Sequence, residues 1–325
     1  MHPDRFLDDL TAKPARLIAL ADSIDDGSAF AWPGVRPTDR VLLTGMGSSW
    51  FAAQVAALRL RRVGVAAVAE LASAERSWPA APDLTVVAIS ASGGSTETLD
   101  LVRELDGARV VALTNTEASP LRELAAEVVD LLAGTEVSGV ACRSELHTIV
   151  ALLALEEQLS GTSLGLAAAC RAAARAVEHL LVTRDAWVSE AAERLAGPNG
   201  TWLVAPADRI ASALQGALMF REVPRRQADG CETGDWSHVD VYLTKTHDYR
   251  ALVFPGSRYD AEAARWMGER SATVVAVQPE GADAFGAAQQ VVRYPAGDHP
   301  LTPLLVETTV AELVAEHLFA HATTS

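Results

Sequence analysis

Lysine is almost absent from this chain of 325 residues, which contains only Lys13 and Lys245. Imine chemistry needs a lysine, because its amine forms the covalent bond to a carbonyl carbon. The chain therefore offers very few candidates for that chemistry. Arginine supplies nearly all of the positive charge instead.

Cysteine is also scarce. Cys142, Cys170 and Cys231 are widely spaced and form no CxxC pair. This spacing excludes a disulfide framework and the usual cysteine-based metal motifs. We interpret Cys170 as a reduced structural thiol, and nothing marks Cys142 or Cys231 as reactive. We expect no metal site and no cofactor.

Long apolar runs are missing too. None reaches the length needed to span a bilayer, and the first residues, MHPDRFLDDL, have the character of neither a signal peptide nor a transit peptide. We therefore expect a cytoplasmic protein that does not contact a membrane.

Basic charge is in deficit. The 42 acidic and 27 basic side chains give a formal net charge of −15, which leaves no electrostatic footprint for nucleic acid. An acidic surface also does not steer an anionic ligand from a distance. Any phosphate must therefore be held locally, by backbone N–H groups and hydroxyls.

The common nucleotide-binding fingerprints are incomplete or absent. A GxGxxG motif starting at Gly45 would need a glycine where Trp50 stands, and no GxxxxGK[ST] loop occurs. Glu70, after the next apolar run, keeps a dinucleotide site weakly open but does not replace that glycine.

Two turns rich in serine and glycine are present instead. Gly45-Met46-Gly47-Ser48-Ser49 follows an apolar run at 41–44, and Ser90-Ala91-Ser92-Gly93-Gly94-Ser95 follows one at 85–89. We expect a helix after each turn, at 50–62 and 96–105. Hydroxyls, glycines and a helix N-terminus together favour an anion. The alternative is an ordinary turn in which Ser95 or Thr96 caps the helix.

Strand and helix patterns alternate along the whole chain, which predicts an α/β protein with parallel sheets covered on both faces. Further strands are expected at 64–68, 109–114, 127–131, 201–205, 239–243, 251–254, 272–277 and 290–294. Further helices are expected at 120–124, 145–159, 167–195, 211–222 and 304–320, with Ser144 as the N-cap of the second. The second half repeats the pattern of the first. Its first turn, Ala205-Pro206-Ala207-Asp208, lacks serine and threonine, so we expect one phosphate pocket per chain.

Five segments in order resemble motifs of the sugar isomerase (SIS) domain family, which includes the isomerase half of glucosamine-6-phosphate synthase. They are Gly47-Ser48-Ser49, Ser90–Ser95, Glu136-Val137-Ser138-Gly139-Val140-Ala141, Gly216-Ala217-Leu218-Met219-Phe220-Arg221-Glu222 and Gly234-Asp235-Trp236-Ser237-His238. The resemblance implies two tandem SIS domains, each a doubly wound, flavodoxin-like parallel sheet sandwiched by helices. We expect a lead-in helix in 1–37, SIS domains at 38–160 and 198–325, and a helical linker at 161–197.

The resemblance also implies a site for a sugar phosphate. Its contacts would be Gly47, Ser48, Ser49, Ser90, Ser92, Gly93, Ser95, Glu136, Ala141 and Arg143. Arg143 could clamp a phosphate or a carboxylate, or be an ordinary surface arginine. Glu136 could contact sugar hydroxyls, or be a solvated loop carboxylate.

Glu222 and His238 are the two candidate catalytic residues. In the family the matching glutamate moves the proton between C1 and C2, and the matching histidine opens the sugar ring from a neighbouring subunit. A homodimer with shared sites is therefore implied. From the residues alone, Glu222 could instead pair with a neighbouring arginine, and His238 could be a locally bonded loop histidine.

Two departures from the family limit the chemistry. Met219 stands where the synthase has a lysine, and no lysine lies near His321-Ala322-Thr323-Thr324-Ser325. We also expect no glutaminase activity, since no initiating cysteine is present. The hypotheses left are a phosphosugar aldose–ketose isomerase or amino-sugar-phosphate deaminase working by enolisation, and a non-catalytic phosphosugar sensor.

Overall fold

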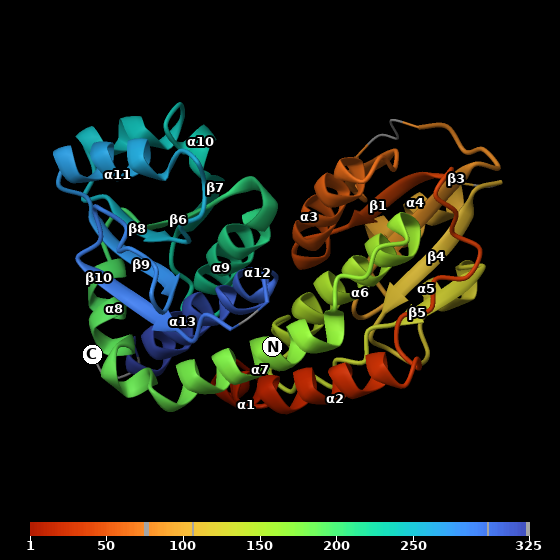
Figure 1. The fold of residues 1–325 in the computed structure, drawn as a ribbon, viewed down its shortest axis with the longest axis horizontal. Helices are drawn as coiled ribbons and strands as arrows, with labels where there is room; N and C mark the ends of the chain where they lie inside the picture. The colour runs from red at the N-terminus through yellow and green to blue at the C-terminus, as the bar shows by residue number, and fades with distance from the viewer. Residues whose placement is uncertain (75–77, 106, 298, 323–325) are drawn as a thin grey trace. The chain divides into compact units, whose positions relative to one another are not determined.

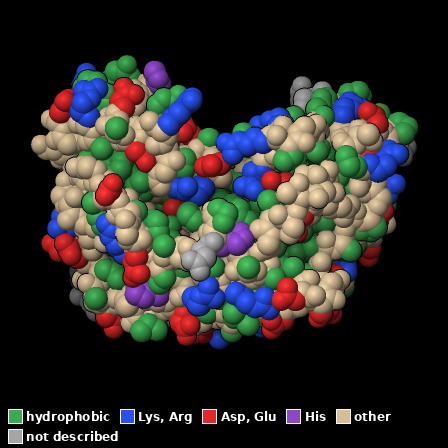
Figure 2. Space-filling view, viewed as in Figure 1, with side chains coloured by type: hydrophobic (Ala, Val, Ile, Leu, Met, Phe, Trp, Pro, Cys, Tyr) green, Lys and Arg blue, Asp and Glu red, His purple; other side chains and the backbone are tan. Residues whose placement is uncertain are grey.

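The computed structural model describes residues 1–74, 78–105, 107–297 and 299–322. The chain folds into two compact units. We call Ala19–Glu136 with Ala141–Ala168 the amino-terminal unit, and Met1–Ile18 with Val137–Val140 and Ala169–Ser325 the carboxy-terminal unit. Figure 2 shows acidic and basic side chains interspersed over the visible face of each unit.

The amino-terminal unit is built on a parallel five-stranded sheet with the order β2-β1-β3-β4-β5 (Figure 1). Its strands are β1 (Arg40–Gly45), β2 (Ala67–Leu71), β3 (Leu84–Ile89), β4 (Arg109–Thr114) and β5 (Glu127–Asp130). Its helices include α3 (Ser48–Arg62), α4 (Thr96–Glu104), α5 (Pro120–Leu124) and α6 (Arg143–Ser160), and α2 (Lys13–Asp25) runs into it. Every residue of β3 is buried, because helices cover both faces of a parallel sheet.

The carboxy-terminal unit repeats this architecture, with the strand order β10-β9-β8-β6-β7. Its strands are β6 (Thr201–Ala205), β7 (Ala228–Glu232), β8 (Arg250–Val253), β9 (Thr273–Pro279) and β10 (Gln290–Tyr294). Its helices are α1 (Phe6–Thr11), α7 (Leu166–Val182), α8 (Val188–Leu195), α9 (Ile210–Glu222), α10 (Thr233–Trp236), α11 (Asp260–Glu269), α12 (Thr302–Val306) and α13 (Thr308–Ala322). Numbered from its own first strand, each sheet has the flavodoxin order 2-1-3-4-5. The expected α/β class with two parallel sheets is confirmed.

The first residues of the chain belong to the carboxy-terminal unit. Phe6 and Leu10 of α1 are fully buried there. The Asp9 carboxylate accepts hydrogen bonds from the backbone N–H groups of Val137 and Ser138. These contacts fix the amino-terminal helix in the unit that contains most of the second half of the sequence.

Several element predictions need correction. The strand expected at 239–243 is wrong, because these residues fall within the 3-10 helix Asp240–Lys245 and its lead-in. Val241 and Thr244 are its buried residues, and a spacing of three matches the 3-10 repeat. The single helix expected at 167–195 is interrupted by the 3-10 turn Arg184–Ala186. Strand β7 and helix α11 were not expected.

Candidate active site

The two serine-rich turns leave neighbouring strands of one sheet. β1 ends at Gly45 and β3 ends at Ile89, and these residues are register partners in a parallel pair. β2 extends the sheet on one side and β4 and β5 extend it on the other, so the strand order reverses between β1 and β3. Open α/β sheets bind ligands outside the carboxyl ends of the strands at such a point.

Two glycines hold these turns in close approach. A Cβ on Gly45 would come within 2.6 Å of the Ser49 Cβ and 2.7 Å of the Ile89 carbonyl oxygen. Gly93 has a φ of +63°, and a Cβ there would collide with the Ser119 side chain. A larger residue at Gly45 would therefore push the first turn away from the end of β3, and one at Gly93 would push the second turn away from the loop before α5.

Ser48 and Ser49 lie within the first turn of α3. The helix begins at Ser48, two residues earlier than expected, after Gly47 with its φ of +52°. Both hydroxyls therefore sit at the N-terminus of a helix of 15 residues. Free N–H groups and the helix dipole make this position favourable for an anion.

The Ser90–Ser95 turn begins with a buried residue and ends at the N-cap position of α4. Ser90 is 6% exposed, and its N–H donates to the Leu113 carbonyl. Ser92 is exposed, and its hydroxyl accepts from the Gly94 N–H at 3.3 Å. Ser95 occupies the N-cap position but makes no side-chain cap bond. Its hydroxyl is therefore oriented toward another partner.

That partner is Glu97. The Ser95 hydroxyl donates to the Glu97 carboxylate at 2.9 Å. The pKa of Glu97 is lowered from its usual value by the backbone N–H of Glu97 itself and by this hydroxyl. The N-terminus of α4 thus already stabilises one negative group. A phosphate bound through Ser95 would have to compete with Glu97.

Glu136 caps helix α6. Its Oε1 accepts from the N–H groups of Cys142, Arg143 and Ser144, and the Ser144 hydroxyl donates to Oε2 at 2.6 Å. Ser144 is therefore not the N-cap that the sequence suggested; Cys142 holds that position. A contact between Glu136 and sugar hydroxyls stays a prediction.

Arg143 is buried rather than on the surface, with 3% of its area exposed. Its guanidinium donates to the carbonyls of Ala133 and Thr135, in the loop that follows β5. Ala141 lies half-buried two residues before it, next to the N-cap of α6. The clamping role of Arg143 and the contact at Ala141 stay predictions.

Glu222 is the last residue of α9 and belongs to the carboxy-terminal unit. The preceding helical residues Met219 and Phe220 are fully buried, and Glu222 itself is half-buried. Burial raises the pKa of its carboxyl, while Arg225 partly opposes that rise. Arg221 donates instead to the Ala228 carbonyl at 2.8 Å. A carboxyl with a raised pKa is suited to take and return protons.

His238 follows the short helix α10 in the same unit, and its imidazole is exposed. The backbone N–H of His238 donates to the Asp235 carbonyl at 2.8 Å. The turn is fixed at its start by the Glu232 carboxylate, which accepts from the Gly234 and Asp235 N–H groups. The buried Trp236 anchors it through an Nε1–H bond to the Tyr249 hydroxyl at 2.7 Å.

Neither lysine is placed as a ready nucleophile. Lys13 is 2% exposed and forms a buried salt bridge with Glu312. Lys245 is exposed, with its ammonium 5.6 Å from the centre of the Tyr242 ring. Among residues 1–74, 78–105, 107–297 and 299–322, no group of three or more His, Cys, Asp or Glu side chains is arranged to hold a metal ion.

At the corresponding turns of the second sheet, the central side chain is an arginine. Arg209, before α9, pairs with the buried Glu307 at 3.0 Å and donates to the carbonyls of Phe254 and Pro255. A Cβ on Gly256 would lie 2.6 Å from the Arg209 Nη2. The sequence showed that this turn lacks hydroxyls, but it did not show that a cation fills it.

Two hydroxyls at the carboxyl edge of the first sheet were not singled out from the sequence. Thr44 is fully buried near the end of β1, and Ser119 precedes α5 with 8% of its area exposed. Within the described part of the chain, neither hydroxyl finds a hydrogen-bond partner. Thr44 could have been found from the sequence, because a polar residue near the end of an apolar strand stands out as a candidate site residue.

Comparison with known proteins agrees with this architecture. Residues 35–155 match the family model described as the SIS domain. A glutamine–fructose-6-phosphate aminotransferase from Streptomyces coelicolor is 30% identical over 86% of this chain and 48% of its own length. The chain thus spans about half the length of the curated relatives it matches.

Solved structures extend the match to nearly the whole chain. The C-terminal domain of glucosamine-fructose-6-phosphate aminotransferase from Francisella tularensis superposes with a TM-score of 0.84 and 19% identity, over 97% of this chain and 95% of that one. A glucosamine-6-phosphate deaminase from Thermotoga maritima gives a TM-score of 0.75 and 17% identity, over 99% and 96%. These superpositions show that the chain shares its fold with both proteins.

The matched region identifies an SIS domain at residues 35–155, and the fold of the whole chain matches tandem SIS domains. More particularly, the chain resembles the isomerase domain of glucosamine-fructose-6-phosphate aminotransferase. Its structural neighbours include sugar-phosphate isomerases and deaminases. No described helix is both long and apolar enough to cross a membrane.

Proposed function

We propose that this chain is a sugar-phosphate isomerase or amino-sugar-phosphate deaminase that works by enolisation. The observation that carries the proposal is the pair of serine-rich turns that leave the neighbouring strands β1 and β3 and enter helices α3 and α4. Helix N-termini and hydroxyls hold a phosphate without any cationic side chain. This suits a protein with a formal net charge of −15.

In this proposal the phosphate and nearby sugar hydroxyls are held by the serine-rich turns. The residues assigned to that role are Ser48, Ser49, Ser90, Ser92 and Ser95. Glu222 takes the proton from C2 of the open-chain sugar and returns it at C1, through an enediol. His238 opens the ring by moving a proton between the ring oxygen and the anomeric hydroxyl. The assignments of Glu222 and His238 rest on the family resemblance and on the raised pKa of Glu222.

Isotope exchange tests the reaction. The protein is incubated in deuterated water with glucosamine 6-phosphate, fructose 6-phosphate or glucose 6-phosphate, and the sugars are examined by NMR. Deuterium at C1 or C2 is expected for at least one of them. Release of ammonia from the amino sugar identifies a deaminase, and ketose formation without ammonia identifies an isomerase.

A non-catalytic phosphosugar sensor is the second candidate. Met219 favours this candidate, because the synthase family has a lysine at that position of the helix. Neither lysine of this chain replaces it, since Lys13 is in a buried ion pair with Glu312 and Lys245 lies on the surface. A sensor would bind a sugar phosphate and leave its carbon-bound hydrogens unexchanged. Tight binding with no deuterium in any sugar would therefore replace the enzyme assignment.

A further inference from the structure

A hollow of about 650 Å³ lies in the carboxy-terminal unit, beside helix α11. One wall is a face of α11 made of small residues, Ala261, Ala264 and Gly268. The facing wall is the loop between β9 and β10, with Phe285 and Gly286. This volume is within the range of small-molecule sites in proteins.

Small residues create this space. A Cβ on Gly268 would meet no atom within 4 Å, although this glycine lies inside a helix without positive φ. A Cβ on Gly286 would come only to 3.7 Å from the Ala264 Cβ, which is ordinary contact. The helix and the loop therefore approach each other near Gly286, while the region at Gly268 stays open.

Asp260 places a half-buried carboxylate at the hollow. Its Oδ2 accepts from the Gly256 N–H at 2.6 Å, and its Oδ1 is buried and, within the described residues, has no hydrogen-bond partner. Burial raises the pKa of this carboxyl, and the backbone of Gly256 and Ser257 and the charge of Arg209 oppose that rise. A carboxylate that uses only part of its bonding capacity would be stabilised by a ligand that supplies an N–H.

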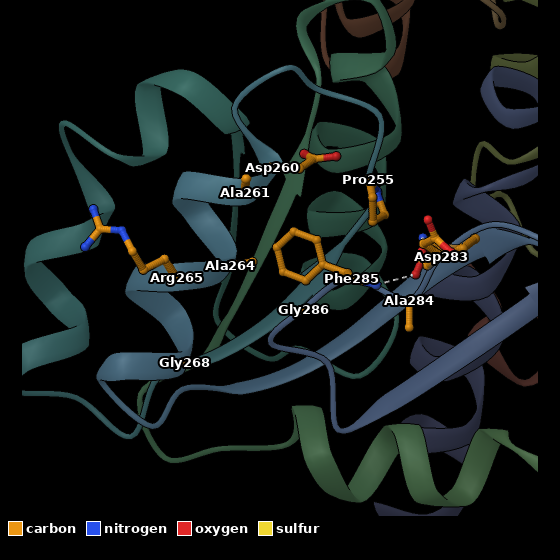
Figure 3. A pocket seen from close by; sticks show the side chains of 11 residues that line it. Pro255, Asp260, Ala261, Ala264, Arg265, Gly268, Asp283, Ala284, Phe285 and Gly286 are labelled. Atoms are coloured by element: carbon orange, nitrogen blue, oxygen red, sulfur yellow. Dashed lines mark hydrogen bonds between the residues drawn. The ribbon is translucent and has the colours of Figure 1, made fainter.

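The charges around the hollow favour a cation. Asp260 and Asp283 both line it. Its one lining arginine, Arg265, pairs with Glu269 on its own helix and stacks on the Trp266 ring at 4.1 Å. In Figure 3 the Arg265 side chain extends away from Phe285, whereas the Asp260 side chain lies above that ring and Pro255 lies to its upper right. Arg209, the other nearby cation, is paired with Glu307, and its charge also opposes the rise that burial causes in the pKa of Asp260.

We propose that this hollow is a second small-molecule site, which binds an organic cation through Asp260 and packs its flat apolar part against Phe285 and the Ala261–Ala264 face. The site is separate from the serine-rich crevice in the amino-terminal unit. Since its ligand is cationic, it takes a class of molecule that the phosphate site would not bind. Burial raises the pKa of the Asp260 carboxyl, so an ammonium or amidinium partner would also favour its ionised form.

Benzamidine is a suitable probe, with the neutral isostere benzamide as its matched control. Calorimetry and saturation-transfer NMR on the whole chain should show benzamidine binding with a dissociation constant of roughly millimolar, as expected for so small a ligand. Benzamide should bind at least ten-fold more weakly. Equal binding of the two, or no benzamidine binding at all, would overturn the proposal.

Three variants locate the site. Asp260→Asn keeps the acceptor for the Gly256 N–H but removes the charge, and should weaken benzamidine binding at least ten-fold. Gly268→Leu fills the open space at a helical position that tolerates leucine, and should abolish binding while the thermal midpoint is kept or raised. Glu262→Gln removes an exposed carboxylate from the same helix outside the hollow, and should change nothing. Unchanged affinity in both Asp260→Asn and Gly268→Leu would place the bound cation elsewhere and contradict the assignment.

Discussion

At the scale of single residues, the proposed phosphate site depends on the hydroxyls of the serine-rich turns. Ser92 is exposed, and Ser95 stands at the start of α4 with its hydroxyl donated to Glu97. No arginine or lysine was assigned to this edge by sequence except Arg143, which binds loop carbonyls. The turns themselves must therefore provide most of the affinity for a phosphate.

Removing two of these hydroxyls should weaken binding. Ser92→Ala combined with Ser95→Ala should weaken the free energy of sugar-phosphate binding by about 2 kcal/mol, which is about 1 kcal/mol for each lost hydrogen bond. Calorimetry with a sugar phosphate that binds the unaltered protein measures this. Ser163→Ala, which removes an exposed hydroxyl bonded to Glu157, is the control. Equal affinity in the double variant and the control would remove these turns from the phosphate site.

Removing the charge of Glu97 should have the opposite effect on phosphate affinity. Since its carboxylate holds the Ser95 hydroxyl, it competes with an incoming phosphate and repels it. Glu97→Gln should therefore tighten phosphate binding by a few-fold, and the gain should shrink at high salt. Asp100→Asn, on the same helix and paired with Arg103, should have little effect. Weaker binding in Glu97→Gln would mean that Glu97 orients the hydroxyl for the ligand instead.

Glu222→Gln should abolish turnover and leave ligand binding nearly intact, because it keeps size and polarity but removes the base. General acid–base groups contribute on the order of a hundred- to ten-thousand-fold. The turnover rate is measured with the substrate that isotope exchange identifies. Glu193→Gln, which changes an exposed carboxylate, is the control. His238→Asn should lower activity on the cyclic sugar more than on an open-chain substrate. Full turnover in Glu222→Gln would refute the enolisation mechanism.

At the scale of helices and strands, several elements were predicted to the residue. Strands β4, β6 and β10 and helix α5 have the expected bounds. β7 was missed because its sequence Ala-Asp-Gly-Cys-Glu has little β-propensity. Its Gly230 instead allows close packing, since a Cβ there would lie 2.7 Å from the Ala213 carbonyl in α9. Such a strand is defined by its neighbours rather than by its own residues.

The candidate site was predictable in its residue types but less so in its bonding. Ser90–Ser95 and Gly47-Ser48-Ser49 were found because serine and glycine after an apolar run mark a strand-to-helix turn. The capping role of Glu136 was not found, because it accepts from N–H groups at Cys142 to Ser144, whose position depends on the loop between them. Bonds of this kind depend on three-dimensional closure, which residue patterns do not encode.

Helix α13 and the Arg209 turn contribute a pH-dependent term to stability. Burial raises the pKa of Glu307 to about 7, against the opposing effect of Arg209. A carboxyl whose folded pKa is raised stabilises the fold below its unfolded pKa of 4.5, and this contribution is lost as the pH rises through about 7. Its size is at most roughly 3 kcal/mol, at about 1.4 kcal/mol per pKa unit.

Urea unfolding at several pH values between 5 and 8 tests this. The free energy of unfolding should fall across that range in the unaltered protein, and fall less in Glu307→Gln, which retains an acceptor for Arg209. Other groups titrate in the same range, so the difference between the two proteins isolates Glu307. Parallel pH profiles would show that Glu307 stays ionised throughout.

At the scale of the whole molecule, the resemblance to the SIS family predicts a homodimer in which His238 serves the neighbouring subunit. Mixing an inactive Glu222→Gln protein with an inactive His238→Asn protein should then restore part of the activity, because one mixed site has both intact residues. Sedimentation should show a dimer at the same concentrations. A fully active monomer at all dilutions would disprove the shared site.

The two sheets have the same strand order but different turns after their central strands: one set is rich in serine, and the other is built around the buried pair of Arg209 and Glu307. If the halves descend from a duplicated segment, they now evolve under different selection. Substitutions in the serine-rich turns would be judged by ligand binding. Substitutions of Arg209 and Glu307 would be judged by folding, so any pair that fills the space and neutralises the charge would survive. Distant members of the lineage should therefore keep the serine-rich turns while the Arg209–Glu307 pair varies in composition.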